Sequence, residues 1–500
     1  MSEKLNKLKE VLGEVADLQS AASLLSWDQQ TYMPAGGGEA RGQHLATIGK
    51  LAHQMATSDE VGKLLDDLKQ EFASANGDSD DAAMIRVAAR DYDKRVRVPA
   101  EFVAEQAIVT AKAFEAWAEA RAKSDFSIFR PHLEKVVDLI HKYISFFPPA
   151  DHPYDTLLDD YETGMKTAEV QAIFNSLRPK QVYLIKAITD RPQVKDKFLH
   201  KKYNETKVWD FGAQVTRKFG YDWSRGRMDK APHPFETSFS VNDVRITNRF
   251  EAGNPLATLF SAMHESGHAM YEQGINAAYE RSSLAHGTSL AVHESQSRLW
   301  ENLVGRSLPF WEFFYPKLKA VFSSQLDGVS LKNFYKAVNK VQPSLIRVNA
   351  DEATYNLHIM LRLELEIAMV EGKLAIKELP EAWNARMKEY LGITPPNDAE
   401  GVLQDIHWSY GSIGYFSTYA LGNLISAQLW EKINIDIRGL DDQIRNGKFD
   451  VLLAWLHTNV HTHGRKYKPQ DLVQRVTGSK ITPEPYVRYL TAKYSDIYDL

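Results

Sequence analysis

Hydrophobic residues recur at helical spacing along most of the chain. Three segments pair an apolar stripe with a charged face especially clearly: "AAMIRVAARDYDKRV" from residue 82, "EFVAEQAIVTAKAFEAWAEARA" from residue 101 and "LHIMLRLELEIAMVEGKLA" from residue 357. An apolar residue at every third or fourth position lets one face of a helix pack against a core. The pattern therefore predicts a fold that is mainly α-helical.

The beginning of the chain follows the same rule. Its charged residues are interrupted at helical spacing by apolar side chains, namely Leu5, Leu8, Leu12, Val15 and Leu18. A secretory signal would need an unbroken apolar core followed by a cleavage site of small residues. We therefore expect a helix here and not a signal peptide.

One segment, residues 234–250, alternates instead. The run "PFETSFSVNDVRITNRF" places apolar or β-branched residues at every second position on either side of "VND". A period of two with a turn in the middle is typical of a β-hairpin. We expect a small sheet just before the segment that carries the candidate chemistry, where an edge strand could pair with an extended peptide.

Nothing in the chain marks a clear domain boundary. Loop-like runs such as "YMPAGGGEARG" and "FASANGDSDD" are short, and no internal repeat or low-complexity segment is present. A chain of 500 residues could hold several domains. The pattern nevertheless favours one large helical domain, residues 1–500, with two lobes.

Composition and charge narrow the classes of function. The chain has a formal net charge of -5, 44% hydrophobic residues and no cysteine. A mildly acidic balance argues against nucleic-acid binding, and no uncharged apolar run reaches the roughly 18 residues of a membrane span. Without cysteine, disulfides are absent and any metal must be bound by His, Asp or Glu. We expect a cytoplasmic protein.

The candidate chemistry lies in "LFSAMHESGHAMYEQG", residues 259–274. His264 and His268 are four residues apart, so on a helix both imidazoles can face one point. Glu265 projects beside them, where its carboxylate can take a proton from a water molecule at the metal. Two ligands and a general base on one helix are typical of a zinc peptidase, in which zinc lowers the pKa of water to roughly 7.

A catalytic zinc needs a third protein ligand. The helical run "SLAVHESQSRLWENLVG" offers Glu294, which follows His268 by 26 residues. This distance allows the first helix to end near Gly274, a loop to follow, and a second helix to cross beside the first. We favour Glu294 because a carboxylate is a common third ligand, and His293 is the alternative.

The other histidines fit structural roles better. His457 and His461 in "WLHTNVHTHGR" also stand four residues apart, with His463 close by, but no acid lies between them to act as a base. We interpret them as partly buried histidines at a helix end. Three further histidines lie outside the predicted constellation and are not expected to be ligands: His233, His286 and His358.

Five short motifs occur along the chain in an order that is typical of one protein family. They are "DVRIT" (residues 243–247), "HESGH" (264–268), "HESQ" (293–296), "IRVNAD" (346–351) and "GVLQDIHW" (401–408). With this order the chain resembles the carboxypeptidase Taq family of thermostable zinc carboxypeptidases, nearly from end to end. The metal ligands and the base match the family pattern without a departure.

The resemblance implies an α-helical fold with a small sheet and a deep groove between two lobes, similar to neurolysin and angiotensin-converting enzyme, with zinc at the floor. It implies release of single amino acids from peptide C-termini, with broad side-chain preference and poor tolerance of proline. A homodimer, and activity with cobalt as well as zinc, are also implied. The alternatives are a zinc endo-oligopeptidase of the same architecture and a catalytically idle peptide-binding protein.

A carboxypeptidase must bind the terminal carboxylate, and an arginine fork can do so bidentately. Arg347 in "IRVNAD" is our first candidate and Arg245 in "DVRIT" the second. Two structural alternatives remain open, since Arg347 could pair with Asp351 four residues on and Arg245 could be a solvated strand residue.

The tetrahedral intermediate of peptide hydrolysis needs a hydrogen-bond donor for its oxyanion. His407, Tyr415 and Tyr419, in "HWSYGSIGYFSTY", are the candidates. Tyrosines in such a segment can equally be core residues. Asp351 is a hypothetical outer partner that would orient a ligand histidine through its second ring nitrogen.

Overall fold

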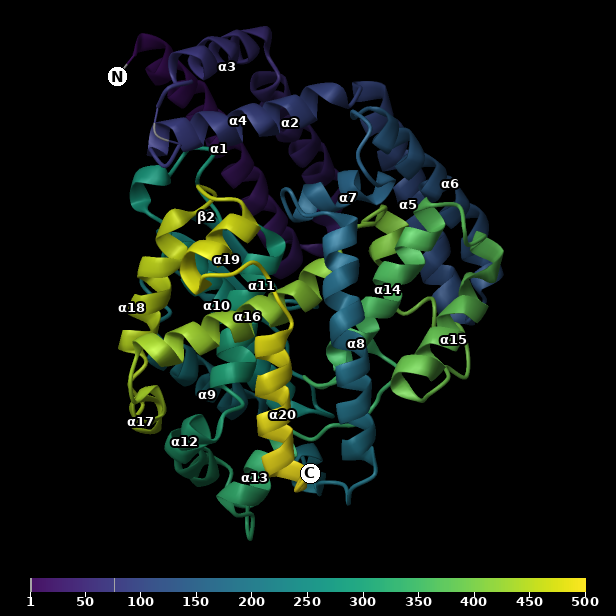
Figure 1. Cartoon of the computed structure of the whole chain (residues 1–500), viewed down its shortest axis with the longest axis vertical. Coiled ribbons are helices and arrows are strands. Elements are labelled where there is room, and N and C mark those ends of the chain that lie inside the picture. Colours follow the sequence, from purple (N-terminus) through teal and green to yellow (C-terminus); the bar gives the residue numbers. More distant parts are fainter. Residues whose placement is uncertain (1, 76) are drawn as a thin grey trace. The chain divides into compact units, whose positions relative to one another are not determined.

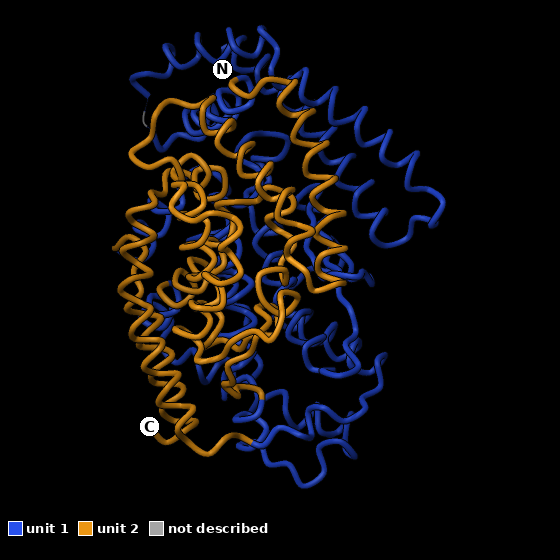
Figure 2. Tube along the Cα trace, turned by 90° about the vertical axis from the view of Figure 1, so that its right-hand side faces the viewer, with its two compact units in different colours: residues 1–96, 195–337, 429–478 blue, residues 97–194, 338–428, 479–500 orange. Residues whose placement is uncertain are grey.

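The computed structural model describes residues 2–75 and 77–500. The chain forms two compact units, each built from three separate stretches of sequence (Figure 2). Unit 1 comprises residues 1–96, 195–337 and 429–478, and unit 2 comprises residues 97–194, 338–428 and 479–500. Both units are mainly helical, which confirms the predicted fold class, whereas one domain with two lobes stays a prediction. In the described residues, no helix combines the length and apolar character that a membrane crossing requires.

Unit 1 holds most of the N-terminal helices together with the helices around the candidate site. The first begins where predicted, capped by the Ser2 hydroxyl, which accepts the Leu5 N–H at 3.3 Å. The α-helices are α1 (Glu3–Thr31), α2 (Gly38–Ala56), α3 (Asp59–Glu71), α4 (Asp80–Arg97), α9 (Glu205–Phe219), α10 (Pro255–Gln273), α11 (Leu290–Arg298), α12 (Leu308–Val321), α13 (Leu331–Val338), α17 (Leu440–Arg445), α18 (Asp450–Asn459) and α19 (Pro469–Thr477). Shorter turns are Ala35–Gly37, Lys197–His200, Ala277–Tyr279 and His461–His463.

The sheet of unit 1 has three strands, in the order β1-β3-β2. The predicted hairpin is confirmed: β2 (Glu236–Ser240) and β3 (Asp243–Asn248) are antiparallel and meet at a two-residue turn. The sequence pattern missed β1 (Met228–Lys230), which pairs parallel with β3 and is too short to show a period of two. Val244 and Ile246 of β3 are fully buried, so the hairpin is anchored in the core beneath α10.

A hydrophobic cluster fixes the loop that follows α10. Buried residues of α1, α3 and α4, among them Leu8 and Leu65, pack against Ile275, Tyr279 and Leu284. Burial of each large aliphatic side chain contributes roughly 1.5–3 kcal/mol. The loop between α10 and α11 is therefore held against the N-terminal helices, and it brings α11 back beside α10.

The two helices of the site touch at their backbones. A Cβ on Gly267 would lie 2.6 Å from Ser297 Cα and 2.7 Å from the Gln296 carbonyl oxygen. Only glycine allows this approach, which explains the glycine inside "HESGH". Just beyond this crossing, α11 continues as a π-helical turn, Leu299–Val304, a feature that often lies near functional sites.

Unit 2 consists of helices and connecting loops, without a strand in its described residues. Helices α8 and α20 lie side by side, as do α5 and α6 (Figure 1). Its α-helices are α5 (Ala100–Lys123), α6 (Phe126–Ser145), α7 (Pro153–Tyr161), α8 (Thr167–Thr189), α14 (Tyr355–Val370), α15 (Leu379–Leu391) and α20 (Glu484–Tyr498), while α16 (Ser417–Asp436) passes from unit 2 into unit 1. Its shorter turns are Arg347–Asn349, Ile376–Glu378 and His407–Tyr410.

Candidate metal centre

Helix α10 presents two histidines of unit 1 on one face. Pro255 occupies its first turn, where a missing N–H leaves no hydrogen bond unmade. His264 and His268 are one turn apart, with ring centroids 4.9 Å from each other and most of each side chain buried. The predicted spacing thus brings both imidazoles to one place.

Glu294 of α11 completes the group. Its Oε2 lies 3.5 Å from His264 Nε2 and 3.4 Å from His268 Nε2. Two donors that each bind a tetrahedral zinc at about 2.0–2.1 Å lie roughly 3.3–3.4 Å apart. The donor set and its spacing therefore fit zinc, and no second group of three such side chains is as close together in the part of the chain that the structure describes.

Glu294 is held by residues of its own helix. Its Oε1 accepts a hydrogen bond from Arg298 Nε at 2.7 Å, and Ser297 Oγ lies 3.0 Å from Oε2. Burial alone would raise the pKa of this carboxyl, but Arg298 and the two histidines keep it well below its usual value. Glu294 is thus ionised, with Oε2 directed at the histidines.

His264 has a carboxylate as its outer partner. His264 Nδ1 lies 3.0 Å from Glu301 Oε2, and Arg298 NH1 lies 3.3 Å from the same oxygen. Burial opposes ionisation of Glu301, but Arg298 and His264 lower its pKa to about 2. Sequence reasoning missed Glu301, which stands two turns after Glu294 in the same helical run. Asp351, the outer partner that the sequence suggests, instead accepts the Ala353 and Thr354 N–H groups before α14.

His268 has a different outer partner. Its Nδ1 lies 2.6 Å from His293 Nδ1, and His293 Nε2 lies 3.0 Å from Glu272 Oε1. His293, the alternative third ligand, is therefore bonded to the far side of His268 rather than joined to the group of three. Burial lowers the pKa of His268 to about 3, which keeps its imidazole neutral at neutral pH, as a ligand must be.

Glu265 is buried beside the histidines, with only 7% of its surface exposed. Burial raises the pKa of its carboxyl to about 7; His264 lowers it, and the neighbouring acids Glu294 and Glu301 raise it. A carboxyl with a pKa in this range can both accept and release a proton near neutral pH. This placement suits the role of general base predicted for Glu265.

Unit 2 holds the second set of predicted residues. Asp405 Oδ1 accepts hydrogen bonds from Arg347 Nε at 3.1 Å and NH2 at 2.8 Å, while its Oδ2 accepts from Arg362 Nε at 2.7 Å. Arg347 therefore pairs with Asp405, and the alternative pairing with Asp351 is wrong, because Arg347 lies in a short 3₁₀ turn. Asp405 and Arg362 were missed because the contacts span tens of residues.

The candidate oxyanion donors lie around this pair. Arg347 NH1 donates to Tyr355 Oη at 3.0 Å, and its guanidinium carbon lies 5.0 Å over the Tyr419 ring. His407 Nε2 is 3.5 Å from Tyr419 Oη, and Tyr415 packs at 5.3 Å from both rings. Burial lowers the pKa of His407 to about 4, so its ring is neutral at neutral pH. The structure thus gathers Arg347, His407, Tyr415 and Tyr419 in one cluster.

Arg245 belongs to unit 1, where it lies in strand β3. It forms two hydrogen bonds of 2.8 Å to Asp243, and its guanidinium carbon lies 4.3 Å over the Trp27 ring. Its side chain is only 17% exposed. Arg245 is therefore not a solvated strand residue, as one alternative had it, but a paired and stacked one.

The remaining histidines take structural positions. Helix α18 ends at Asn459, so His457 and His461 do not share a helix face, and His461 is buried 2.9 Å from Gln296 Oε1. His358 is fully buried in α14. None of these histidines belongs to the group of three donors found in the described residues.

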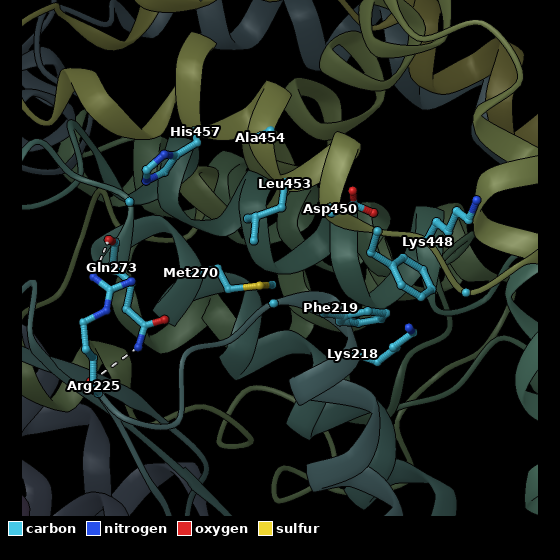
Figure 3. A pocket seen from close by; sticks show the side chains of 14 residues that line it. Lys218, Phe219, Arg225, Met270, Gln273, Lys448, Asp450, Leu453, Ala454 and His457 are labelled. Carbon is cyan, nitrogen blue, oxygen red and sulfur yellow. Dashed lines mark hydrogen bonds between the residues drawn. The ribbon is translucent and has the colours of Figure 1, made fainter.

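A cavity of about 450 Å³ lies at the C-terminal end of α10, away from the three donors. In Figure 3, Leu453 and His457 of α18 lie above Met270, and Lys218 lies beside Phe219. None of His264, His268 and Glu294 lines it. The cavity is therefore separate from the candidate centre.

Comparison with known proteins shows which family the chain matches. The family model described as Carboxypeptidase Taq (M32) metallopeptidase matches residues 7–494. The chain is 39% identical over 501 residues to "Thermostable carboxypeptidase 1" of Thermus thermophilus, covering 98% of each chain. It is 36% identical over 490 residues to "Carboxypeptidase 1" of Bacillus subtilis, covering 98% of this chain and 97% of that one. The crystal structure of the M32 carboxypeptidase from Deinococcus radiodurans R1 matches with a TM-score of 0.96 and 41% identity, over 100% of both chains.

Proposed function

The chain belongs to the carboxypeptidase Taq (M32) family of metallocarboxypeptidases, and we propose that it is a zinc enzyme that releases single amino acids from peptide C-termini. The observation that carries the proposal is the separation of 3.4–3.5 Å between the Glu294 oxygen and the two imidazole nitrogens. His264, His268 and Glu294 are the proposed ligands. When bound, zinc supplies a Lewis acid that polarises the scissile carbonyl and lowers the pKa of water to roughly 7.

Glu265 is the proposed general base and acid. Its carboxylate takes the proton of the attacking water and then delivers it to the nitrogen of the leaving amino acid. The pKa of about 7 supports this double role, because neither protonation state is strongly favoured near neutral pH. Glu265 thus ends the reaction as it began, ready for the next peptide.

Arg347 is the proposed ligand of the peptide's terminal carboxylate. A guanidinium has five N–H donors, and those of Arg347 make three hydrogen bonds, two to Asp405 and one to Tyr355, among the described residues. One N–H on each terminal nitrogen is left, which is the pair that a bidentate carboxylate needs. Arg245 stays a weaker candidate, because Asp243 already occupies its fork.

His407, Tyr415 and Tyr419 are the proposed donors to the oxyanion. The neutral His407 ring carries one N–H, and each tyrosine carries one O–H that can rotate toward a new acceptor. Their clustering around Arg347 supports a shared role in substrate binding. Substitution of the tyrosines by phenylalanine would separate this role from simple packing.

The finer properties follow from the family. We propose zinc as the metal with cobalt as a substitute, broad side-chain preference with poor release next to proline, a homodimer, and a cytoplasmic location. The fold is proposed to share the deep-groove architecture of neurolysin and angiotensin-converting enzyme. Sedimentation of the purified protein tests the dimer, and metal analysis tests the zinc.

A time course with one peptide tests the activity. An N-terminally blocked peptide of about ten residues is incubated with the purified enzyme, then with chelated enzyme to which zinc is restored, and mass spectrometry follows the products. We expect loss of one C-terminal residue at a time, abolished by the chelator and restored by zinc. Internal cleavage would instead indicate an endo-oligopeptidase and remove Arg347 from its role. No cleavage despite bound zinc would indicate an idle binding protein.

Glu265→Gln tests the base. The neutral amide cannot accept the proton of water, so we expect kcat to fall by roughly 10²- to 10⁴-fold. The three ligands remain, so the zinc content measured by atomic emission should equal that of the parent enzyme. An enzyme that keeps its activity with this substitution would exclude Glu265 as the base.

A further inference from the structure

Glu272 is a buried carboxylate that the proposed reaction does not use. It lies on the same face of α10 as the two histidines, one turn beyond His268, and only 6% of its side chain is exposed. Its Oε1 accepts the Gly287 N–H at 2.8 Å and lies 3.0 Å from His293 Nε2. Its Oε2 lies 3.0 Å from Ser238 Oγ and 3.1 Å from His286 Nδ1. Four partners on one buried carboxylate, next to a metal ligand, point to a role for Glu272.

The positions of the protons along this chain of contacts can be worked out from its two ends, His268 and Glu272. A neutral His268 that binds a metal through Nε2 carries its proton on Nδ1, so Nδ1 donates to His293 Nδ1. His293 then accepts at Nδ1 and carries its own proton on Nε2, which faces Glu272. An ionised carboxylate can only accept, so both ends require the same arrangement.

The surroundings of Glu272 favour its ionised form. Burial alone would raise its pKa, but the hydrogen bonds from His286 and His293 bring the pKa well below its usual value. Gly287 lets the rings close, because a Cβ at that position would lie 2.7 Å from both His293 Cδ2 and Tyr271 Cε1. Glycine at position 287 thus lets the loop pack closely against the His293 ring, which contacts His268 at 2.6 Å.

We propose that Glu272 and His293 are a positioning pair that holds His268 in the tautomer that leaves Nε2 open to the metal. The inference rests on the proposed metal centre. It makes the two ligand histidines unequal: His264 is oriented directly by Glu301, whereas His268 is oriented by Glu272 through an intervening imidazole. Outer partners of this kind typically change metal affinity by about 10- to 100-fold.

Zinc affinity and zinc dissociation rate, measured on the full chain with a chelating indicator, test the proposal. His293→Leu keeps a similar side-chain volume but removes both hydrogen bonds, and we expect about 10- to 100-fold weaker zinc binding. Glu272→Gln can keep an acceptor for His293 and loses only the charge, so its loss should be smaller. Ser238→Ala is the matched control, since it removes a partner of Glu272 outside the path to His268, and it should bind zinc like the parent.

The outcomes separate the pair from the centre itself. Parent protein that binds no stoichiometric zinc would refute the proposed centre, whatever the variants do. Parent-like affinity in His293→Leu, with normal binding in the parent, would overturn the positioning role alone. An equal loss in Ser238→Ala would show a general packing effect and would also overturn it.

A second measurement does not depend on a folded variant. In metal-free parent protein labelled with ¹⁵N-histidine, the nitrogen chemical shifts report the tautomer of each ring. We expect the His268 proton on Nδ1 and the His293 proton on Nε2. A His268 proton on Nε2 would overturn the proposal, because that nitrogen would then be closed to the metal.

Discussion

The candidate metal centre of unit 1 and the arginine cluster of unit 2 are both buried groups of charged side chains. Carboxylates outnumber guanidiniums in the first, and guanidiniums outnumber carboxylates in the second. Around the metal centre, three buried acids, Glu265, Glu294 and Glu301, face two guanidiniums: Arg298 bonds Glu294 and Glu301, and Arg306 bonds Glu301. In unit 2, Arg347 and Arg362 share the single carboxylate of Asp405. Buried charge that its neighbours do not balance is costly. The first group is therefore suited to receive a cation, and the second to receive an anion.

The two groups also differ in what balances their charges when neither metal nor substrate is bound. In unit 1 the histidines lie between carboxylates and bind a metal only when they are neutral. A bound cation would therefore balance the negative charge of the carboxylates. Arg347 and Arg362 are joined by Asp405, so the cluster of unit 2 is held together before any substrate arrives. Removing one charge at a time tests this difference between the two groups.

The largest effect is expected from Glu294→Gln. The amide replaces the charged donor by a neutral one in the group of three, and we expect zinc affinity to fall by more than the roughly 10- to 100-fold that is typical of outer partners. Glu301→Gln, which changes such a partner, is the matched control and should fall within that range. Zinc retained after dialysis measures both. Equal losses in the two variants would mean that Glu294 is not a ligand.

Asp405→Asn should be the next largest change, and it acts on stability. The substitution leaves two buried guanidiniums without an anion, which costs about 3–5 kcal/mol in comparable buried pairs. The arginines keep the pKa of Asp405 well below its usual value, so this stabilisation is present above about pH 4 and is lost only as the pH falls further. The loss of stability is measured by chemical unfolding at pH 7.5, with hydrogen exchange in α14 as the signal that is monitored.

Glu105→Gln provides the control for that experiment. Glu105 pairs with Lys142 at 2.5 Å, but both side chains are about half exposed, so removal should cost less than about 1 kcal/mol. A loss in Asp405→Asn as small as in Glu105→Gln would contradict the view that unit 2 stores an excess of buried positive charge.

The third prediction concerns pH and Glu366, a fully buried acid of α14. Burial raises its pKa to about 7, partly offset by hydrogen bonds from Tyr154, Gly414 and Trp408. The folded state therefore holds the proton more tightly than the unfolded chain, so stability falls as the pH rises from about 4.5 to 7, by on the order of 3 kcal/mol. Hydrogen exchange in α14 during chemical unfolding at several pH values measures the slope.

Glu366→Gln should flatten this slope, whatever it does to absolute stability, because the amide does not titrate. Glu105→Gln again serves as the control and should keep the slope of the parent. An unchanged slope in Glu366→Gln would place the titrating group elsewhere. Glu265 of unit 1 has a similar pKa of about 7, so burial raises the pKa of one acid in each unit.

The sequence could predict whatever depends on local spacing. The four-residue interval between His264 and His268, the helix end near Gly274 and the hairpin all follow from periodicity, and the structure has them. The outer partners could not be predicted in this way. Asp405 meets Arg347 across 58 residues, and the role of His293 depends on the close approach of two helices. Such contacts are set by tertiary packing, and a short stretch of sequence does not show which distant residues meet.

The smallest effect is expected from Tyr355→Phe. The Tyr355 hydroxyl accepts a hydrogen bond from the Arg347 guanidinium at 3.0 Å, and hydrogen bonds to charged groups typically contribute about 1.5–3 kcal/mol. Arg347 keeps its two bonds to Asp405, so the guanidinium should stay in place and lose only part of its orientation. We expect KM for a C-terminal peptide substrate to rise about five-fold with kcat nearly unchanged.

The control is Tyr143→Phe, whose hydroxyl bonds Asp160 instead of Arg347 and which should leave KM unchanged. A fall in kcat beyond ten-fold in Tyr355→Phe would place that hydroxyl among the groups that touch the reacting atoms. Tyr355→Phe is expected to have a smaller effect than Glu301→Gln because the two side chains differ in charge. The outer partner of a metal-ligating histidine is a charged carboxylate, whereas that of Arg347 at this position is a neutral hydroxyl, since Asp405 already supplies the charge. The same geometric role should therefore be several-fold weaker in unit 2 than in unit 1.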